Sequence, residues 1–284
     1  MKAKHSTKFP GNLARYQDAL EASMIDYVKV SLGEVSTNLG LTQSKVGGYP
    51  YFPKNEPYPH SHHNEPLILL AQINFSEMPG LEEFPDTGIL QFFVEGSADN
   101  QEQEDHRVYY HPEVNLEQAL SDFGFLDDYY INGDMYVLES LQPGEAYPIS
   151  FELTCAFPGP TAPEFDAKIA EFESKKTEVE PDDVINFKVD LEDAEYEWLD
   201  HLLGESQLHQ VGGYPCFIQP DPRGREFQDY MLLFQLDSDG GLDEEDDTGY
   251  KVVWGDAGIA NFFILKEDFK KRDFSRVLFE WSCA

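Results

Sequence analysis

The chain has 284 residues, 41% of them hydrophobic, and includes 21 Phe and 15 Tyr. This composition excludes a wholly disordered chain, and no segment approaches the ~18 consecutive apolar residues that a membrane-spanning helix needs. With 20 basic and 54 acidic residues, the formal net charge is -34 at pH 7. Nucleic acid and anionic membranes are therefore poor partners, because a polyanion repels both.

The N-terminal segment and the cysteines bear on localisation. No apolar segment follows the early lysines, so we expect no secretory signal. The three cysteines, Cys155, Cys216 and Cys283, are far apart and form no CxxC pair, which fits free thiols in a reducing compartment. We therefore expect a soluble cytoplasmic protein.

The first predicted elements are a helix and a strand. Apolar residues recur at helical spacing near the N-terminus, at Leu13, Tyr16, Leu20 and Met24. Residues 67–74 are nearly all apolar and bounded by polar residues, as in a strand that is covered on both faces. This strand is expected in the centre of a sheet.

Two further helices are predicted in the middle of the chain. Residues 161–164, Thr-Ala-Pro-Glu, are typical of a capping box with proline in the first turn, followed by apolar residues on one face at Phe165, Ile169 and Phe172. A second helix is expected to begin with Asp190 as its cap and to end before Gly204. Its predicted buried face consists of Leu191, Ala194, Trp198, Leu199 and Leu202.

Two strands are predicted in the last part of the chain. Residues 231–237 form a second nearly continuous apolar run, which predicts another central strand. Residues 250–256 are expected to add a short strand and a turn.

The pentapeptide VGGYP occurs twice, at residues 46–50 and 211–215. Further blocks match in the same order: the apolar runs 69–74 and 232–237, the Asp-Thr-Gly tripeptides 86–88 and 247–249, and the strand-like segments 88–94 with 258–264 and 107–110 with 276–279. Matched blocks in a fixed order predict an internal duplication.

We therefore predict an α+β fold, with mainly antiparallel sheets in two tandem pseudo-symmetric repeats and a few peripheral helices. The whole chain, 1–284, is expected to be a single domain. Repeat one covers about 27–156, an acidic helical connector about 157–205, and repeat two about 206–284.

The glycine doublets are the first candidate site. Gly47 and Gly48, like Gly212 and Gly213, let the backbone adopt positive φ or approach another segment closely. The proline that follows keeps Tyr49 or Tyr214 extended. Each pentapeptide is then either a packed corner of a sheet or one wall of a groove that the two corners share, and both interpretations stay open.

Taken together, these blocks resemble the YwqG-like family of bacterial proteins. The resemblance covers roughly residues 20–284 and includes the segments Gly88-Ile-Leu-Gln-Phe-Phe and Trp254-Gly-Asp-Ala-Gly. It implies a duplicated, largely β fold and a domain of unknown function, whose members occur in bacterial genomes and sometimes near toxin and immunity genes. It implies no catalytic residue.

Polar residues inside the apolar strands need partners when they are buried. Gln72 and Gln235, and likewise Gln91 and Asn261, are expected to bond to backbone across the interface between the repeats, or else to contact a ligand. Trp254 and Asp256 mark the first place to look if the protein were an enzyme.

Familiar metal and phosphate motifs fit poorly. Residues 60–65 hold the only histidine cluster, in which His62 and Glu65 could share a metal, but no distant pair of ligands stands out and a solvated loop is the expectation. Residues 237–247 depart from the calcium-loop pattern. No phosphate-binding glycine motif and no nucleophile elbow is present. We therefore predict no metal, no cofactor and no catalytic residue.

Three functions remain open. We favour a non-catalytic acidic binding protein, immunity-like, that neutralises a basic protein partner. The alternatives are a binder of a small molecule or peptide in a groove between the corners, and an enzyme of unrecognised type. The candidate binding residues are Gly47, Gly48, Tyr49, Gln72, Gly212, Gly213, Tyr214, Gln235, Trp254 and Asp256.

Overall fold

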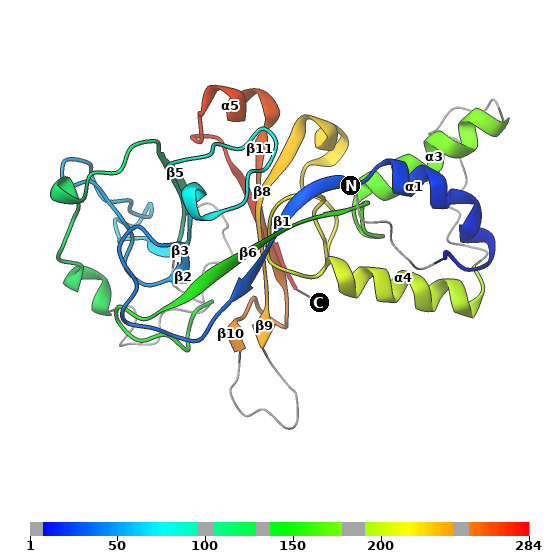
Figure 1. Ribbon diagram of the computed structural model, residues 1–284. Helices are drawn as coiled ribbons and strands as arrows, with labels where there is room; N and C mark the ends of the chain where they lie inside the picture. The colour runs from blue at the N-terminus through cyan, green and yellow to red at the C-terminus, as the bar shows by residue number, and fades with distance from the viewer. Residues whose placement is uncertain (1–7, 96–104, 129–136, 178–190, 241–249, 284) are drawn as a thin grey trace.

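The computed structural model describes residues 8–95, 105–128, 137–177, 191–240 and 250–283 (Figure 1). Its main element is a ten-stranded sheet in which every neighbouring pair is antiparallel. The helices α1, α3 and α4 lie together at one side of the sheet (Figure 1). The protein is thus α+β with a mainly antiparallel sheet, as predicted.

The sheet has the order β12-β11-β8-β7-β1-β6-β2-β3-β4-β5. Its strands are β1 (Ile25–Leu32), β2 (Lys45–Gly47), β3 (Ile68–Asn74), β4 (Ile89–Val94), β5 (His106–His111), β6 (Ala146–Ala156), β7 (Gln210–Gly212), β8 (Tyr230–Asp237), β11 (Ile259–Leu265) and β12 (Leu278–Ser282). The two apolar runs, β3 and β8, are interior strands, which confirms the prediction from their composition. Both faces of these strands are buried, so the strands lack the alternation of apolar and polar residues that is typical of a half-exposed strand.

The matched blocks occupy corresponding places on either side of the central β1–β6 pair. In one half β2 pairs with β3, with Lys45 opposite Gln72. In the other half β7 pairs with β8, with Gln210 opposite Gln235. The outer strands follow in the same order, β4 and β5 on one side and β11 and β12 on the other.

The sheet curls until it is a nearly closed, barrel-like structure. Phe92 of β4 lies with its ring centroid 5.1 Å from that of Phe234 on β8 and 4.7 Å from that of Phe262 on β11. At the edges, His106 of β5 has its Nε2 2.8 Å from the carbonyl oxygen of Val277, next to β12. The two halves therefore enclose one hydrophobic core.

The helices bury a second, smaller core. This layer consists of the 3₁₀ helix Gly11–Tyr16, α1 (Gln17–Ala22), α3 (Pro163–Thr177) and α4 (Asp193–Ser206). The predicted apolar positions Leu13, Tyr16, Leu20, Phe165 and Ile169 are buried together there, which confirms the faces of the first two predicted helices. On α4, Leu199 and Leu202 are buried as predicted, whereas Ala194 is exposed.

The predicted ends of α4 are wrong. Glu192 is its N-cap and forms a capping box with Glu195, whereas Asp190 lies outside the described residues. Gly204 lies inside the helix, since α4 continues to Ser206. The reciprocal capping box starts the helix more effectively than a lone acidic residue, and helix packing overrides the low helical propensity of one glycine.

The strand predicted after residue 249 is confirmed as β10 (Tyr250–Val252), which pairs with β9 (Asp239–Gly240). The central strands β1 and β6 and the short helix α5 (Lys266–Lys271), which follows β11, were not predicted. Residues 178–190 of the predicted connector, residues 241–247 of the segment compared with the calcium loop, and the tripeptide 247–249 lie outside the described residues. Within the described ranges, no helix combines the length and apolar character needed to cross a membrane.

Candidate functional site

Each glycine doublet is a sharp corner that ends a three-residue strand. The φ angles are 75° at Gly47 and 71° at Gly48, and 69° at Gly212 and 80° at Gly213. These values lie in the left-handed region, which side chains rarely tolerate. The prediction of positive φ at both doublets is confirmed.

The first corner is covered by residues 138–146 of the same chain. Leu141 and Leu138 lie directly over Gly47, and a side chain at Gly48 would meet Cβ of Ala146 at 2.8 Å. Tyr49 stacks on Phe123, and its hydroxyl donates a hydrogen bond of 2.6 Å to Asp127. Burial and this carboxylate raise the pKa of Tyr49 to about 12. The phenol of Tyr49 therefore stays neutral at physiological pH, and its hydrogen bond to Asp127 stabilises the corner.

The buried amides brace the corners from within. Gln72 accepts a 3.0 Å hydrogen bond from the backbone N–H of Tyr51 and donates to the carbonyls of Leu41 and Gln43. Gln235 does the same in the other half, accepting from Cys216 N–H at 2.7 Å and donating to the carbonyls of Ser206 and Leu208.

The predicted backbone partners are thus confirmed, but they belong to the same half as each amide. Gln91 donates to the carbonyl of Tyr51, and Asn261 to that of Cys216. The expectation that these bonds cross the interface between the halves is wrong. The reason is local, because the chain returns past each strand directly after its corner, and all four amides are fully buried beneath it.

His111 extends this network and should make stability depend on pH. Its Nε2 lies 3.0 Å from Gln91 Oε1, and burial lowers the pKa of His111 to about 4, below the unfolded value of 6.5. The unfolded chain then binds more protons between these two pH values, so stability falls as the pH falls from about 6.5 to 4. Compared with wild type, His111→Gln should lose about 1–3 kcal/mol less between pH 7 and pH 4.5 in urea titrations. An identical loss in both proteins would contradict this assignment.

Two candidate residues, Trp254 and Asp256, do not line the cavity at the second corner, which is described next. Trp254 is buried, and its backbone N–H donates to Ser238 Oγ at 3.0 Å. Asp256 is exposed in the following turn.

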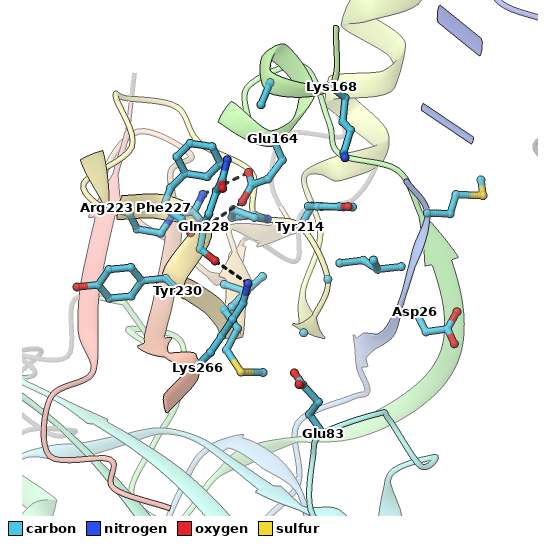
Figure 2. A pocket seen from close by; sticks show the side chains of 18 of the residues that line it. Asp26, Glu83, Glu164, Lys168, Tyr214, Arg223, Phe227, Gln228, Tyr230 and Lys266 are labelled. Atoms are coloured by element: carbon cyan, nitrogen blue, oxygen red, sulfur yellow. Dashed lines mark hydrogen bonds and ion pairs between the residues drawn. The ribbon is translucent and has the colours of Figure 1, made fainter. Parts of the chain in front are cut away.

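A cavity of about 1480 Å³ opens beside the second corner (Figure 2). It lies between the N-terminal half of α3, the starts of β1 and β8, and the loop 81–84 of the first half. Of the ten candidate residues, Gly212, Gly213 and Tyr214 line it. Tyr214 is held in place by its hydroxyl, which donates to the carbonyl of Ser23 at 2.7 Å.

The cationic side chains that line the cavity are bonded to other groups of the protein. Arg223 has a side chain only 1% exposed, with Nη1 3.1 Å from Glu164 Oε1 and Nη2 2.8 Å from Asp221 Oδ2. Lys168 pairs with Glu171 at 3.1 Å. Lys266 donates from Nζ to the carbonyl of Gln228 at 2.6 Å. Figure 2 shows the bonds of Arg223 and Lys266 as dashed lines.

Three carboxylates of the cavity are free by contrast. Asp26, Glu82 and Glu83 are exposed, and their side chains form no ion pair or hydrogen bond within the described part of the chain. Glu83 has a φ of 71°, a left-handed conformation that is uncommon for a residue with a side chain. Figure 2 shows Glu83 and Asp26 across the cavity from the Arg223–Glu164 pair. The cavity is thus an acidic cleft.

The histidine cluster predicted at residues 60–65 is a loop that lies against the start of β5. No group of three or more His, Cys, Asp or Glu among the described residues is arranged to hold a metal ion. His62 of the predicted cluster contacts Asp105 with its Nδ1, and its backbone N–H donates to the same carboxylate at 3.0 Å. This contact fixes the loop 60–65 against the start of β5.

Fold and cleft define a class: an α+β protein with a curled antiparallel sheet and an acidic cleft at one corner. A family model described as "Domain of unknown function (DUF1963)" matches residues 44–283, so the chain belongs to this family. The resemblance to the YwqG-like proteins is consistent with that membership. No curated protein matches the chain.

Proposed function

We propose that the protein is a non-catalytic binding protein that takes a cationic segment of a basic protein partner into the acidic cleft. The observation that carries this proposal is the imbalance of the cleft: its cations are bonded to other groups of the protein, whereas Asp26, Glu82 and Glu83 have no partner within the described part of the chain. A ligand with lysine or arginine side chains would supply the missing cations.

Electrostatics favour this partner at long and at short range. The formal net charge of -34 attracts a basic protein before contact and increases its association rate at low salt. Once the partner is bound, the cleft lowers the local dielectric constant, so each contact between a cation and a free carboxylate becomes stronger than it is in water. Binding should therefore weaken as the salt concentration rises.

The size of the cleft favours a peptide segment over a small molecule. Its volume of about 1480 Å³ exceeds the roughly 300–1,000 Å³ typical of small-molecule sites. It also draws its walls from both halves of the protein. An extended chain can fill such a space, whereas a small molecule would leave much of it to water.

We also propose that the fold arose by internal duplication and that the protein is cytoplasmic. The equivalent strand order and the equivalent bonds of Gln72 and Gln235 support two tandem repeats, about 27–156 and about 206–284, joined by a helical acidic connector. Free cysteines support a reducing, cytoplasmic setting. An immunity-like role, in which a basic protein is neutralised, is the physiological form of the proposal.

Charge reversal in the cleft tests this function. The probe is a fluorescein-labelled octapeptide of alternating lysine and valine, measured by fluorescence anisotropy at low and at physiological salt. The double variant Glu82→Lys/Glu83→Lys should weaken binding by at least about tenfold, because two attractive contacts become repulsive.

The matched control is Glu113→Lys/Glu117→Lys, which changes the net charge equally at exposed positions outside the cleft. It should alter the affinity by less than about threefold, since screening limits the effect of distant surface charge. Equal losses in the two double variants would show that binding depends on net charge alone and would refute the cleft as the site.

A further inference from the structure

The cleft coincides with a gap in the ten-stranded sheet. Strand β7 has three residues, whereas the strands on either side of it, β1 and β8, have eight each. β7 pairs with β1 only over Tyr27–Lys29 and with β8 only at Phe234 and Gln235. Beyond Gly212, Ile25 and Asp26 of β1 and residues 230–233 of β8 have no pairing strand on the β7 side among the described residues.

The residues on both sides of this gap line the cleft. They are Ile25 and Asp26 at the start of β1, and Tyr230, Met231 and Leu232 at the start of β8. Because neighbouring strands lie about 4.8 Å apart, two strands separated by one missing strand lie about 10 Å apart. That distance accommodates one extended chain.

Backbone groups of β1 face into the gap. The N–H of Val30 donates to the carbonyl of His209 at 2.9 Å, so the main chain of Val30 points toward the β7 side. The backbone groups of alternate residues point to the same side of a strand, which places those of Val28 and Asp26 on this side as well. Val28 lies opposite Val211 of β7, whereas Asp26 lies beyond the end of the β7 pairing.

At the equivalent position in the first half, a segment of the same chain covers the corner. There β2 also ends at a glycine doublet, but residues 138–146 of the chain lie over it, with Leu138 and Leu141 against Gly47. At the second corner the side chains of Leu81 and Phe84 lie against Gly212 and that of Tyr27 lies against Gly213, and the cleft opens beside these residues and Tyr214.

We propose that the partner segment binds as an extended strand that continues the line of β7, pairing with β1 and β8 through main-chain hydrogen bonds. This inference rests on the proposed function and specifies how the basic segment is held. A side chain at Gly212 would point at Leu81 and Phe84, so alternate residues of the inserted strand face the loop that carries Glu82 and Glu83. Lysine or arginine at every second position fits this geometry.

The test removes main-chain donors and leaves the charges intact. The alternating lysine–valine octapeptide is compared with the same peptide N-methylated at its valines. An N-methyl amide cannot donate a hydrogen bond and keeps neighbouring strands apart, so the methylated peptide should bind at least about tenfold more weakly. Circular dichroism of the free peptides checks that neither is aggregated.

A pair of protein variants tests the main-chain hydrogen bonds that β1 would form with the inserted strand. Asp26→Pro and Asp26→Ala remove the same carboxylate, but only proline removes the backbone N–H that faces the gap. Asp26→Pro should therefore bind the unmethylated peptide several-fold more weakly than Asp26→Ala. Equal thermal stability of the two variants establishes that the fold is retained, and if Asp26→Pro does not fold, the comparison of the two peptides decides alone.

The outcomes separate this inference from the proposed function. Selective loss with the methylated peptide supports strand insertion. Equal binding of both peptides, still sensitive to Glu82→Lys/Glu83→Lys, would overturn strand insertion and leave the basic-partner function standing. Binding of neither peptide at low salt would overturn both.

Discussion

Replacing Arg223 with methionine should lower the free energy of unfolding by about 3 kcal/mol, the scale on which removal of one partner from a buried ion pair destabilises a protein. The guanidinium is buried, bonds to both Asp221 and Glu164, and lies with Cζ 4.7 Å from the ring centroid of Phe263. Methionine would fill much of the volume but leave two carboxylates without a cation.

The effect should reach the cleft, because Arg223 joins the loop before β8 to the first turn of α3. Urea titration gives the stability, and Arg223→Lys is the matched control for charge. Lysine keeps the positive charge but cannot form the forked bonds to two carboxylates, so it should recover less than half of the loss. Full recovery by lysine would show that charge alone, without the geometry of the guanidinium, stabilises this wall.

Gly47→Ala should destabilise the protein by about 2–5 kcal/mol, through two separate costs. A left-handed backbone conformation costs an alanine about 1–2 kcal/mol, and overpacking of a buried position costs about 1–3 kcal/mol more. Both apply at Gly47, whose φ is 75° and whose added methyl group would collide with Leu141.

Two further variants separate these costs. Gly40→Ala is the control, because Gly40 has no positive φ and a methyl group there would meet only Gln43, at 3.4 Å. It should change stability by less than about 0.5 kcal/mol. In a double-mutant cycle, Leu141→Ala should relieve part of the penalty of Gly47→Ala. Strict additivity of the two substitutions would contradict the proposed collision.

Much of the fold could be predicted because local physical chemistry determines it. The continuous apolar runs of β3 and β8 require cover on both faces, and adjacent glycines before Tyr-Pro predict a corner with positive φ. The helices were recognisable from apolar spacing and from the proline at the start of α3. The structure confirms each of these elements.

The cleft could not be predicted in the same way. Its free carboxylates, Asp26, Glu82 and Glu83, come from segments far apart in the chain, and they are three among 54 acidic residues. Nothing in two identical pentapeptides indicates that residues 138–146 cover one corner and leave the other beside an open cleft. That difference arises from tertiary packing, in which Leu138 and Leu141 lie against Gly47, whereas Leu81 and Phe84, from a different segment that also lines the cleft, lie against Gly212.

The N-cap of α4 was also predicted wrongly, because a contact distant in sequence determines it. Several acidic residues precede this helix, and each is a plausible cap in the sequence. Glu195 decides the choice, because its carboxylate accepts hydrogen bonds from Glu192 N–H at 2.7 Å and also from the N–H groups of Asn12 and Leu13. The contact with the N-terminal segment is long-range and cannot be inferred from spacing.

Amide hydrogen exchange in the presence of the lysine–valine octapeptide tests the central claim most directly. The account predicts slower exchange at Asp26 and at residues 230–232, on the two sides of the gap in the sheet, with no change around Gly47 to Tyr49 at the covered corner. Equal protection at both corners, or protection confined to surfaces outside the cleft, would contradict it.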